Sequence, residues 1–459
     1  MPIKRHEFIS GAASVAFSPK KGFDFGAYLR MYAVSDVRAD IDQIWQTFLT
    51  TAVDPFYTSN RLIVEAKFDA AKQQLTKPRT ICEAWLLIAQ LLASFNDAHV
   101  GMDFPDGALE DAVYRFPVLF ALGRNNDLIV NLDRSGTIPP LSQILSINDM
   151  SSQRYVDLAL RCLGAQNPTL HRIRIAHASP WISVAALGPR VDYDITWLTP
   201  HGKPVTSRIV ASSRPPSSQH KLAYSFSMID HGSIGYIDYR RCENYHAFEK
   251  FLMTTCNKLR NNSARALVID IRNNFGGDSS LNDLLWTYVS DKPFAQSGPE
   301  TVRSSSLLKQ KYGKARYTQD YGEPAWSAGD GTLVTIPMSL VEPRPVRNRY
   351  TGPVYLITSE ATFSSGMMCA IAAKEYGLAT LVGARIAEPT DTTGEVFGFI
   401  TRRLGLQVGI PTAIERGPKP TKRGVGVIPN VPIVAPADEA SKVDYVLEKT
   451  LELIRKRHA

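Results

Sequence analysis

The sequence predicts an α/β fold, because apolar runs typical of buried strands alternate with helical patterns through its second half. Ala266–Ile271 is a strand pattern, and a helix pattern starts near Ser279 after a polar turn. Pro353–Thr358 is a second strand pattern, followed by small and apolar residues at helical spacing over Ser365–Tyr376. Repeated alternation of this kind is typical of helices layered on a sheet.

Length and composition indicate an ordinary globular protein of two or three domains. The chain has 459 residues, of which 44% are hydrophobic and 21% charged. Its net charge of +8 comes from scattered Lys and Arg, which argues for a solvated surface and against nucleic-acid binding. No apolar run approaches the ~18 residues that span a bilayer. The five cysteines form no CxxC pair, so we do not expect a metal site; nothing in the sequence implies an organic cofactor either.

The first 20 residues are interpreted as a possible export leader. Lys4-Arg5-His6-Glu7-Phe8-Ile9 resembles a twin-arginine signal in which His6 replaces the second arginine. Ser14-Val15-Ala16 has the small-x-small form of a cleavage site. This pattern predicts a periplasmic or extracellular protein. The alternative is a disordered N-terminus on a cytoplasmic protein.

Residues 21–110 are predicted to form a helical region. Helical patterns cover Val37–Thr50, Asn60–Gln74 and Thr80–Phe95. The third pattern opens with Thr80 and Glu83 at the spacing of a capping box, and its apolar character requires burial. Asp97 and His99 follow on the next loop. A histidine there is held rigidly and can still face a cleft, although it can equally be a hydrogen-bonded loop residue.

Residues 111–215 are predicted to form a β-rich module. Its predicted elements are a hairpin of Val118–Leu122 with Leu128–Leu132, a strand at Ile144–Ile147, a helix at Arg154–Leu163 and a hairpin of Val191–Leu198 with Pro204–Val210. Ser212–Ser218 is rich in serine and proline and is predicted to be a linker.

Residues 220–459 are predicted to form the α/β domain. Besides the elements above, we expect a strand at Ser233–Tyr239, a helix at His246–Arg260, a strand at Leu378–Val382, a hairpin of Val396–Thr401 with Leu406–Ile410 and a final helix at about Asp438–Lys456. Residues 292–349 look irregular. A loop this long is usually functional, so we expect it to border a substrate cleft.

Two turns of this domain carry candidate functional residues. Ser364 stands where a helix begins, so the N–H group of Ser365 and the positive end of the helix dipole can hold an oxyanion beside it. Gly276-Gly277 follows a strand and lets backbone N–H groups approach a ligand. The simpler interpretations are a helix cap for Ser364 and a tight turn for the glycines.

Together these stretches resemble the C-terminal processing peptidases, also called tail-specific proteases, a family that includes the protease core of tricorn. The matching residues are Ala266–Gly277, Thr362–Gly366 after the strand Val354–Ile357, Leu381–Gly383 with Glu388–Thr390, and Gly426–Pro432. The resemblance covers roughly residues 220–435. It implies a Clp-protease/crotonase-like catalytic domain in which Ser364 is the nucleophile and Gly276, Gly277 and Ser365 form the oxyanion hole.

The resemblance also suggests the partner of the serine. The Ser-Lys branch of the family needs a lysine, but none occurs between Lys374 and Lys419. The tricorn-like branch uses a histidine, and His99 is the candidate base. Its neighbour here is Ala98 in place of serine, and Arg423 stands near the place of the branch's glutamate. The available carboxylates to support the imidazole are Asp97, Glu388 and Glu395, and we rank the first two above the third.

We therefore predict a serine-type endopeptidase acting on peptides or proteins, with Ser364 as nucleophile and His99 as base. Residues 111–215 resemble a divergent PDZ-like module, which would capture the peptide, although a purely structural β-unit is an alternative. Activity should fall as the pH drops through the imidazole pKa, near ~6.5. Two other classes stay open: an inactive peptide-binding homologue, and a crotonase-type enzyme that stabilises a thioester enolate.

Overall fold

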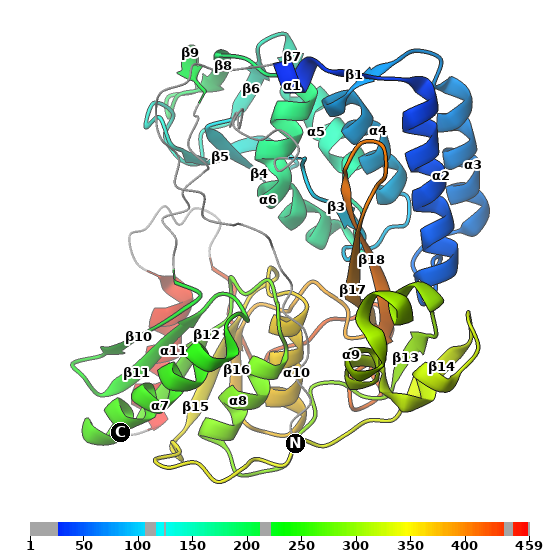
Figure 1. Ribbon diagram of the computed structural model, residues 1–459. Coiled ribbons are helices and arrows are strands. Elements are labelled where there is room, and N and C mark those ends of the chain that lie inside the picture. Colours follow the sequence, from blue (N-terminus) through cyan, green and yellow to red (C-terminus); the bar gives the residue numbers. More distant parts are fainter. Residues whose placement is uncertain (1–25, 106–115, 124, 212–221, 436–443, 458–459) are drawn as a thin grey trace. The chain divides into compact units, whose positions relative to one another are not determined.

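The computed structural model describes residues 26–105, 116–123, 125–211, 222–435 and 444–457 (Figure 1). The described chain divides into two compact units. The first comprises residues up to 211 together with 395–412, and the second comprises 222–394 and 413–457. Both contain helices and strands, so the mixed α/β class is confirmed. The candidate leader and the linker at 212–218 lie outside the described residues.

Helices dominate the start of the first unit. Its elements are α1 (Gly26–Leu29), β1 (Met31–Tyr32), α2 (Val34–Thr51), α3 (Arg61–Gln74), β2 (Arg79–Thr80) and α4 (Ile81–Ala93). The three predicted helices are therefore confirmed. The capping box is also present: Glu83 N donates to Thr80 Oγ1 at 3.3 Å, and Thr80 N donates to Glu83 Oε2 at 2.9 Å. α4 buries Trp85, Ile88 and Leu92 in the core of this unit.

The rest of the first unit contains both strands and helices, over the range for which a β-rich module was predicted. β4 (Val118–Leu122) pairs with β5 (Leu128–Asp133), and a four-stranded antiparallel sheet has the order β7 (Met150–Ser151), β6 (Ile144–Ile147), β8 (Asp192–Leu198) and β9 (Pro204–Val210). α5 (Ser152–Cys162) was expected, but α6 (Pro168–Leu187) was not. The helix was not recognised from the sequence, because it contains Pro180 and its buried face includes the polar Ser179 and Ser183. These serines bond Phe120 N and Tyr155 Oη.

The second unit is built on a six-stranded sheet. Its strand order is β10 (Tyr224–Ile229), β11 (Ile234–Tyr239), β12 (Ala266–Asp270), β15 (Val354–Thr358), β16 (Thr380–Gly383) and β19 (Val431–Pro432). β10 is antiparallel to β11, and every other pair is parallel. The carboxyl ends of β12 and β15 consequently meet at one edge of the sheet, where the two candidate turns begin.

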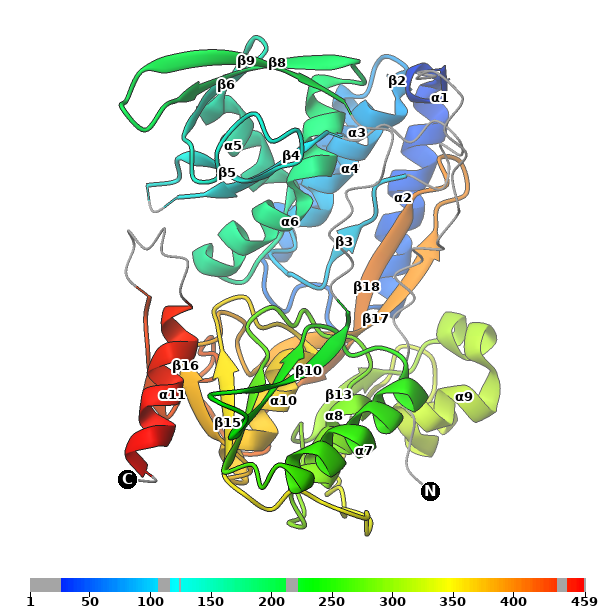
Figure 2. The same cartoon turned by 90° about the vertical axis from the view of Figure 1, so that its left-hand side faces the viewer.

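Helices cover both faces of this sheet (Figure 2). α7 (Tyr245–Asn261), α8 (Ser280–Val289) and α10 (Ser365–Glu375) pack on one face, and α11 (Tyr445–Arg457) packs on the other. The burial follows the alternation of side chains along a strand. In β12, Leu267 and Ile269 face the three helices, whereas Ala266 and Val268 face α11.

The segment at residues 292–349 was wrongly predicted to be irregular. It contains β13 (Glu300–Arg303), α9 (Ser306–Ser327) and β14 (Leu333–Ile336). Non-helical backbone at Gly313 and Gly322, together with Pro324, interrupts α9 and explains why the helix was missed.

A long hairpin contributes to both units. It consists of β17 (Thr392–Ile400) and β18 (Gln407–Glu415), and it is longer at both ends than the predicted hairpin. The end of β18 pairs with β13, Ile414 opposite Thr301, in the second unit. In the first unit, Val408 of β18 pairs with Met102 of β3 (Gly101–Met102).

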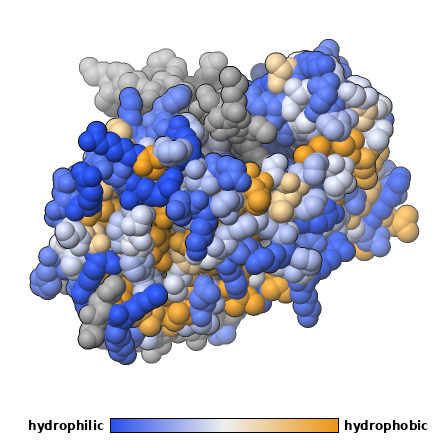
Figure 3. All heavy atoms as spheres, turned by 90° about the horizontal axis from the view of Figure 1, so that it is seen from below, coloured by the Kyte–Doolittle hydropathy of each residue, from blue (hydrophilic) through white to orange (hydrophobic). Residues whose placement is uncertain are grey.

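On the face seen in Figure 3, hydrophilic side chains surround smaller groups of apolar ones. Across the described ranges, no helix combines the length and apolarity needed to cross a membrane.

Candidate active site

Ser364 lies in a strained turn between β15 and α10. Its backbone has φ +53° and ψ −126°, a region that non-glycine residues rarely occupy. The side chain makes no capping hydrogen bond, so the helix-cap interpretation is wrong. A strained serine between a strand and a helix is typical of nucleophilic serines, because the turn projects the hydroxyl away from the backbone.

The turn after β12 holds this strained turn in place. Thr362 Oγ1 donates to Ile271 O at 2.9 Å, and Phe363 N donates to Asn274 O at 2.9 Å. A Cβ atom on Gly366 would lie only 2.8 Å from Asn274 O, so the start of α10 packs directly on the turn. Two stretches separated by about 90 residues in sequence therefore form one rigid site.

The paired glycines let the turn after β12 pack closely against its neighbours. Gly276 has φ +95° and Gly277 has φ +126°, both outside the range of ordinary side chains. A Cβ atom on Gly276 would lie 2.8 Å from Ser364 Cβ and 3.0 Å from Ser365 N. A Cβ atom on Gly277 would overlap the carbonyl oxygen of Cys242. The tight-turn interpretation is correct, but the turn also contacts the candidate nucleophile.

The three backbone amides of the predicted oxyanion hole differ in availability. Gly276 N donates to Asn274 Oδ1 at 2.8 Å. Within the described chain, neither Gly277 N nor Ser365 N has an acceptor. Ser365 Oγ donates to Gly277 O at 2.6 Å and so ties the residues of these two amides together. Gly277 N and Ser365 N are therefore the donors that can receive a developing oxyanion.

Glu388 brings a buried carboxylate to the same turn. Its side chain is fully buried, so it is not the surface carboxylate that we considered as an alternative. Glu388 Oε2 accepts a hydrogen bond from Ser364 N, and Oε1 accepts one from Thr392 Oγ1 at 3.4 Å. The carboxylate thus fixes the backbone of the candidate nucleophile.

His99 belongs to the first unit, where the loop after α4 is held by polar contacts. Asp97 Oδ1 accepts from His99 N at 2.8 Å and from Gln166 Nε2 at 3.1 Å. Gln166 Oε1 accepts from Ala98 N at 3.2 Å. The Nδ1 atom of His99 lies 3.9 Å from Asp97 Oδ1. Asp97 therefore fixes the loop and carries the charge beside the imidazole.

Burial keeps the imidazole of His99 neutral. It lowers the pKa of His99 to about 4; Asp97 opposes this shift, and the positive charge of Arg174 adds to it. Arg174 is half-buried, and the loss of solvent around its guanidinium lowers its pKa to about 10. The pKa near ~6.5 that we assumed from the sequence for an unperturbed histidine is therefore too high. A neutral imidazole at neutral pH is the form that a general base requires.

The other residues considered from the sequence lie elsewhere. Glu395 belongs to the hairpin segment of the first unit, in a left-handed conformation with φ +50°. Arg423 is exposed in the loop before β19.

Sequence reasoning missed the polar side chains beneath the site. The buried Asn274 bonds the glycine turn, and the buried Asn282 bonds the start of α10. The buried Gln296 bonds Ser279, just before α8. Asn282 gave only a weak signal, because the polar residues Ser280, Asp283 and Thr287 also occur in α8. Gln296 offered none, since it lies in a loop with no regular pattern.

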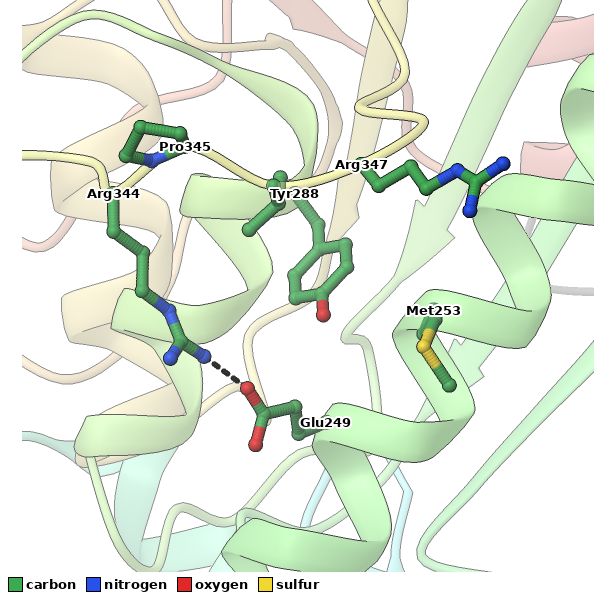
Figure 4. A pocket seen from close by; sticks show the side chains of 7 residues that line it. Glu249, Met253, Tyr288, Arg344, Pro345 and Arg347 are labelled. Atoms are coloured by element: carbon green, nitrogen blue, oxygen red, sulfur yellow. Dashed lines mark hydrogen bonds and ion pairs between the residues drawn. The ribbon is translucent and has the colours of Figure 1, made fainter.

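A pocket of about 260 Å³ lies away from these turns (Figure 4). It is lined by Glu249 and Met253 of α7, Tyr288 of α8 and residues 344–347. Arg344 forms an ion pair with Glu249 at its edge. The pocket contains none of the candidate catalytic residues.

Comparison with protein families assigns the part of the chain that carries Ser364. Residues 233–433 match the model of peptidase family S41. The match covers less than half of the chain; it supports a hydrolase of the serine peptidase class and the resemblance to C-terminal processing peptidases. Among curated proteins, no sequence matches significantly.

Solved structures support the fold over most of the chain. Mature CPAF has 15% sequence identity and a TM-score of 0.64, over 92% of this chain and 96% of that protein. Mature CPAF complexed with lactacystin gives 15% identity and a TM-score of 0.63, over 92% and 97%. The photosystem II D1 C-terminal processing protease has 13% identity and a TM-score of 0.48, over 88% and 95%. At these identities the likeness to CPAF concerns the fold alone.

Proposed function

We propose that the protein is a serine endopeptidase in which Ser364 attacks the carbonyl carbon of a peptide bond. The observation that carries the proposal is the strained Ser364 beside two backbone amides without acceptors, Gly277 N and Ser365 N. Attack places a negative charge on the carbonyl oxygen, and two preorganised N–H donors stabilise that charge in the transition state. The family assignment of residues 233–433 supports the same chemistry.

His99 is proposed as the general base, as in the histidine-containing branch of the family. It would take the proton from Ser364 Oγ and return it to the leaving amine. The proposal rests on the resemblance and on the neutral imidazole, whose pKa is lowered to about 4. The negative charge of Asp97 would offset part of the free energy needed to protonate the imidazole, because Asp97 Oδ1 lies 3.9 Å from Nδ1.

Glu388 is proposed to support the nucleophile through the backbone. Its carboxylate accepts from Ser364 N, and this contact stabilises the strained turn that presents the hydroxyl. The initial hypothesis, that Glu388 orients the imidazole of His99, remains an alternative role for the same residue.

The β-rich module at 111–215 is proposed to capture the peptide as a PDZ-like unit within a protein whose catalytic part has the Clp-protease/crotonase fold. The support is its small antiparallel sheet with helix α5, because PDZ-like modules bind a peptide as an added strand. The competing function is an inactive homologue that binds peptides without cleaving them. The absence of the family's lysine between Lys374 and Lys419 favours that alternative.

Labelling with a fluorophosphonate probe tests the proposal, since the probe forms a covalent bond only with an activated serine. The unaltered protein should be labelled, and mass spectrometry of peptides should place the adduct on Ser364. Ser364→Ala should abolish labelling. Binding of a peptide without labelling from pH 6 to 9, where a base with a pKa of about 4 is neutral, would favour the inactive homologue.

A further inference from the structure

We propose that Asn282, on α8, is a positioning residue that fixes Ser365 so that its amide can receive the oxyanion. The inference rests on the proposed function and adds a residue outside the turns already described. Asn282 Nδ2 donates to Ser365 O at 2.8 Å, and Ser365 is the first residue of α10. Asn282 does not touch the substrate in this proposal, because it acts only through Ser365.

The amide of Asn282 is fully buried and fully used. Besides Ser365 O, its Nδ2 donates to Gln296 Oε1 at 2.8 Å. Its Oδ1 accepts from Tyr239 Oη at 3.3 Å. A buried amide that satisfies both donors and its acceptor has one orientation, and any rotation would leave a polar atom unpaired.

The direction of these hydrogen bonds is imposed by Gln296. Gln296 Nε2 donates to Ser279 O at 2.9 Å and to Asp283 Oδ1 at 2.5 Å. Because both of these partners are acceptors, Gln296 must turn its oxygen toward Asn282. Asn282 then faces two acceptors, Gln296 Oε1 and Ser365 O. Only a group with two N–H donors satisfies both, which explains why an asparagine serves here and an aspartate would not.

Ser365 is consequently held at two points. Its carbonyl accepts from Asn282, and its hydroxyl donates to Gly277 O at 2.6 Å. Ser365, which supplies one oxyanion donor, is thus hydrogen-bonded to Gly277, which supplies the other. Removing the Asn282 contact should loosen this pair without altering Ser364 or the base.

Loss of this contact should slow the chemical step more than it weakens substrate binding, because the amide of Ser365 acts on charge that develops in the transition state. A misplacement of about 1 Å in an active site can cost about 10²-fold in rate. We therefore expect Asn282→Asp to reduce the rate of fluorophosphonate labelling by roughly 10- to 100-fold.

The pH dependence of Asn282→Asp separates positioning from a general structural role. An ionised aspartate presents only acceptors to Ser365 O, whereas a protonated one can donate a single O–H bond. Burial raises the pKa of an aspartate, so part of the labelling rate should return as the pH is lowered from about 8 to about 5. Asn261→Asp, the same exchange at an exposed position, is the control and should label at the unaltered rate.

The outcomes distinguish this inference from the proposed function. No labelling of the unaltered protein would contradict the proposed function itself. If the unaltered protein is labelled, a folded Asn282→Asp that labels at the same rate, or whose loss does not respond to pH, overturns the role of Asn282. If Asn282→Asp fails to fold, Asn282→Leu decides, because leucine has a similar size and leaves Ser365 O without the Asn282 donor. A folded Asn282→Leu with an unaltered labelling rate also overturns the inference.

Discussion

The turns around Ser364 and the loop around His99 reach rigidity by different means. The Ser364 site is made by topology, because β12 and β15 are parallel neighbours and their carboxyl ends bring two turns together. The His99 loop is held by polar side chains, chiefly the buried Asp97 and the half-buried Gln166 and Arg174. Backbone geometry therefore governs the nucleophile, whereas burial and charge govern the candidate base. Substitutions should affect the two regions through different observables.

The largest effect is expected from His99→Ala. General base catalysis contributes typically about 10²- to 10⁴-fold, so the rate of peptide hydrolysis should fall by that factor while Ser364 and its amides stay intact. The unaltered protein should retain activity at pH 5 to 6 and lose it only near the His99 pKa of about 4. The pH profile of hydrolysis measures this limb. A fully active His99→Ala would remove His99 from the mechanism.

Gly276→Ala should disrupt the packing around Ser364. The added Cβ would lie 2.8 Å from Ser364 Cβ, in a backbone conformation that disfavours any side chain. We expect at least about 10²-fold slower labelling, the cost of a displaced oxyanion donor. Gly377→Ala is the matched control, because Gly377 also has positive φ but nothing within 4 Å. It should cost only about 1 kcal/mol of stability and no activity. Equal effects of the two substitutions would argue against close packing at the site.

The free energy of unfolding should depend on pH because His99 is buried. Its folded pKa, about 4, lies below that of the unfolded chain, so the unfolded state binds protons more readily as the pH falls. The stability linked to the neutral imidazole is therefore fully present above about pH 6.5. About 3 kcal/mol of the free energy of unfolding is lost as the pH falls toward about 4. Denaturant unfolding at several pH values measures the slope. His99→Gln should flatten it, and an unchanged slope would show that other groups titrate.

The smallest effect separates the two roles of Glu388. If the residue only accepts from Ser364 N, Glu388→Gln should keep most activity, because an amide oxygen can also accept that bond. If its charge supports an imidazolium, the same variant should lose about 10-fold or more, as expected for removing one charged partner. Glu388→Ala, which removes the acceptor altogether, is the comparison in both cases. Hydrolysis rates of the three proteins decide between the two roles.

The sequence was informative where a local backbone requirement determines the residue type. Gly276 and Gly277 were identified because a backbone with positive φ favours glycine. Ser364 was identified because serine is common where a helix starts. The lowered pKa of His99 was not predictable, because it depends first on burial by distant elements and then on Arg174, which is 75 residues away along the chain. Gln296 was equally hidden, since its role depends on long-range hydrogen bonds. Helix α6 was missed for a similar reason, because its buried serines take part in hydrogen bonds with other elements.

The division of β17 and β18 between the units has a consequence for biosynthesis. Leu404, Leu406, Val408 and Ile410 enter the core of the first unit, and the buried Asp40 accepts from Leu404 N at 2.8 Å. Residues 222–394 must therefore leave the ribosome before this early core can close. Such distant pairing slows folding and leaves apolar surface exposed in the nascent chain. The first unit should depend on chaperones during translation, and its final folding should wait for the hairpin.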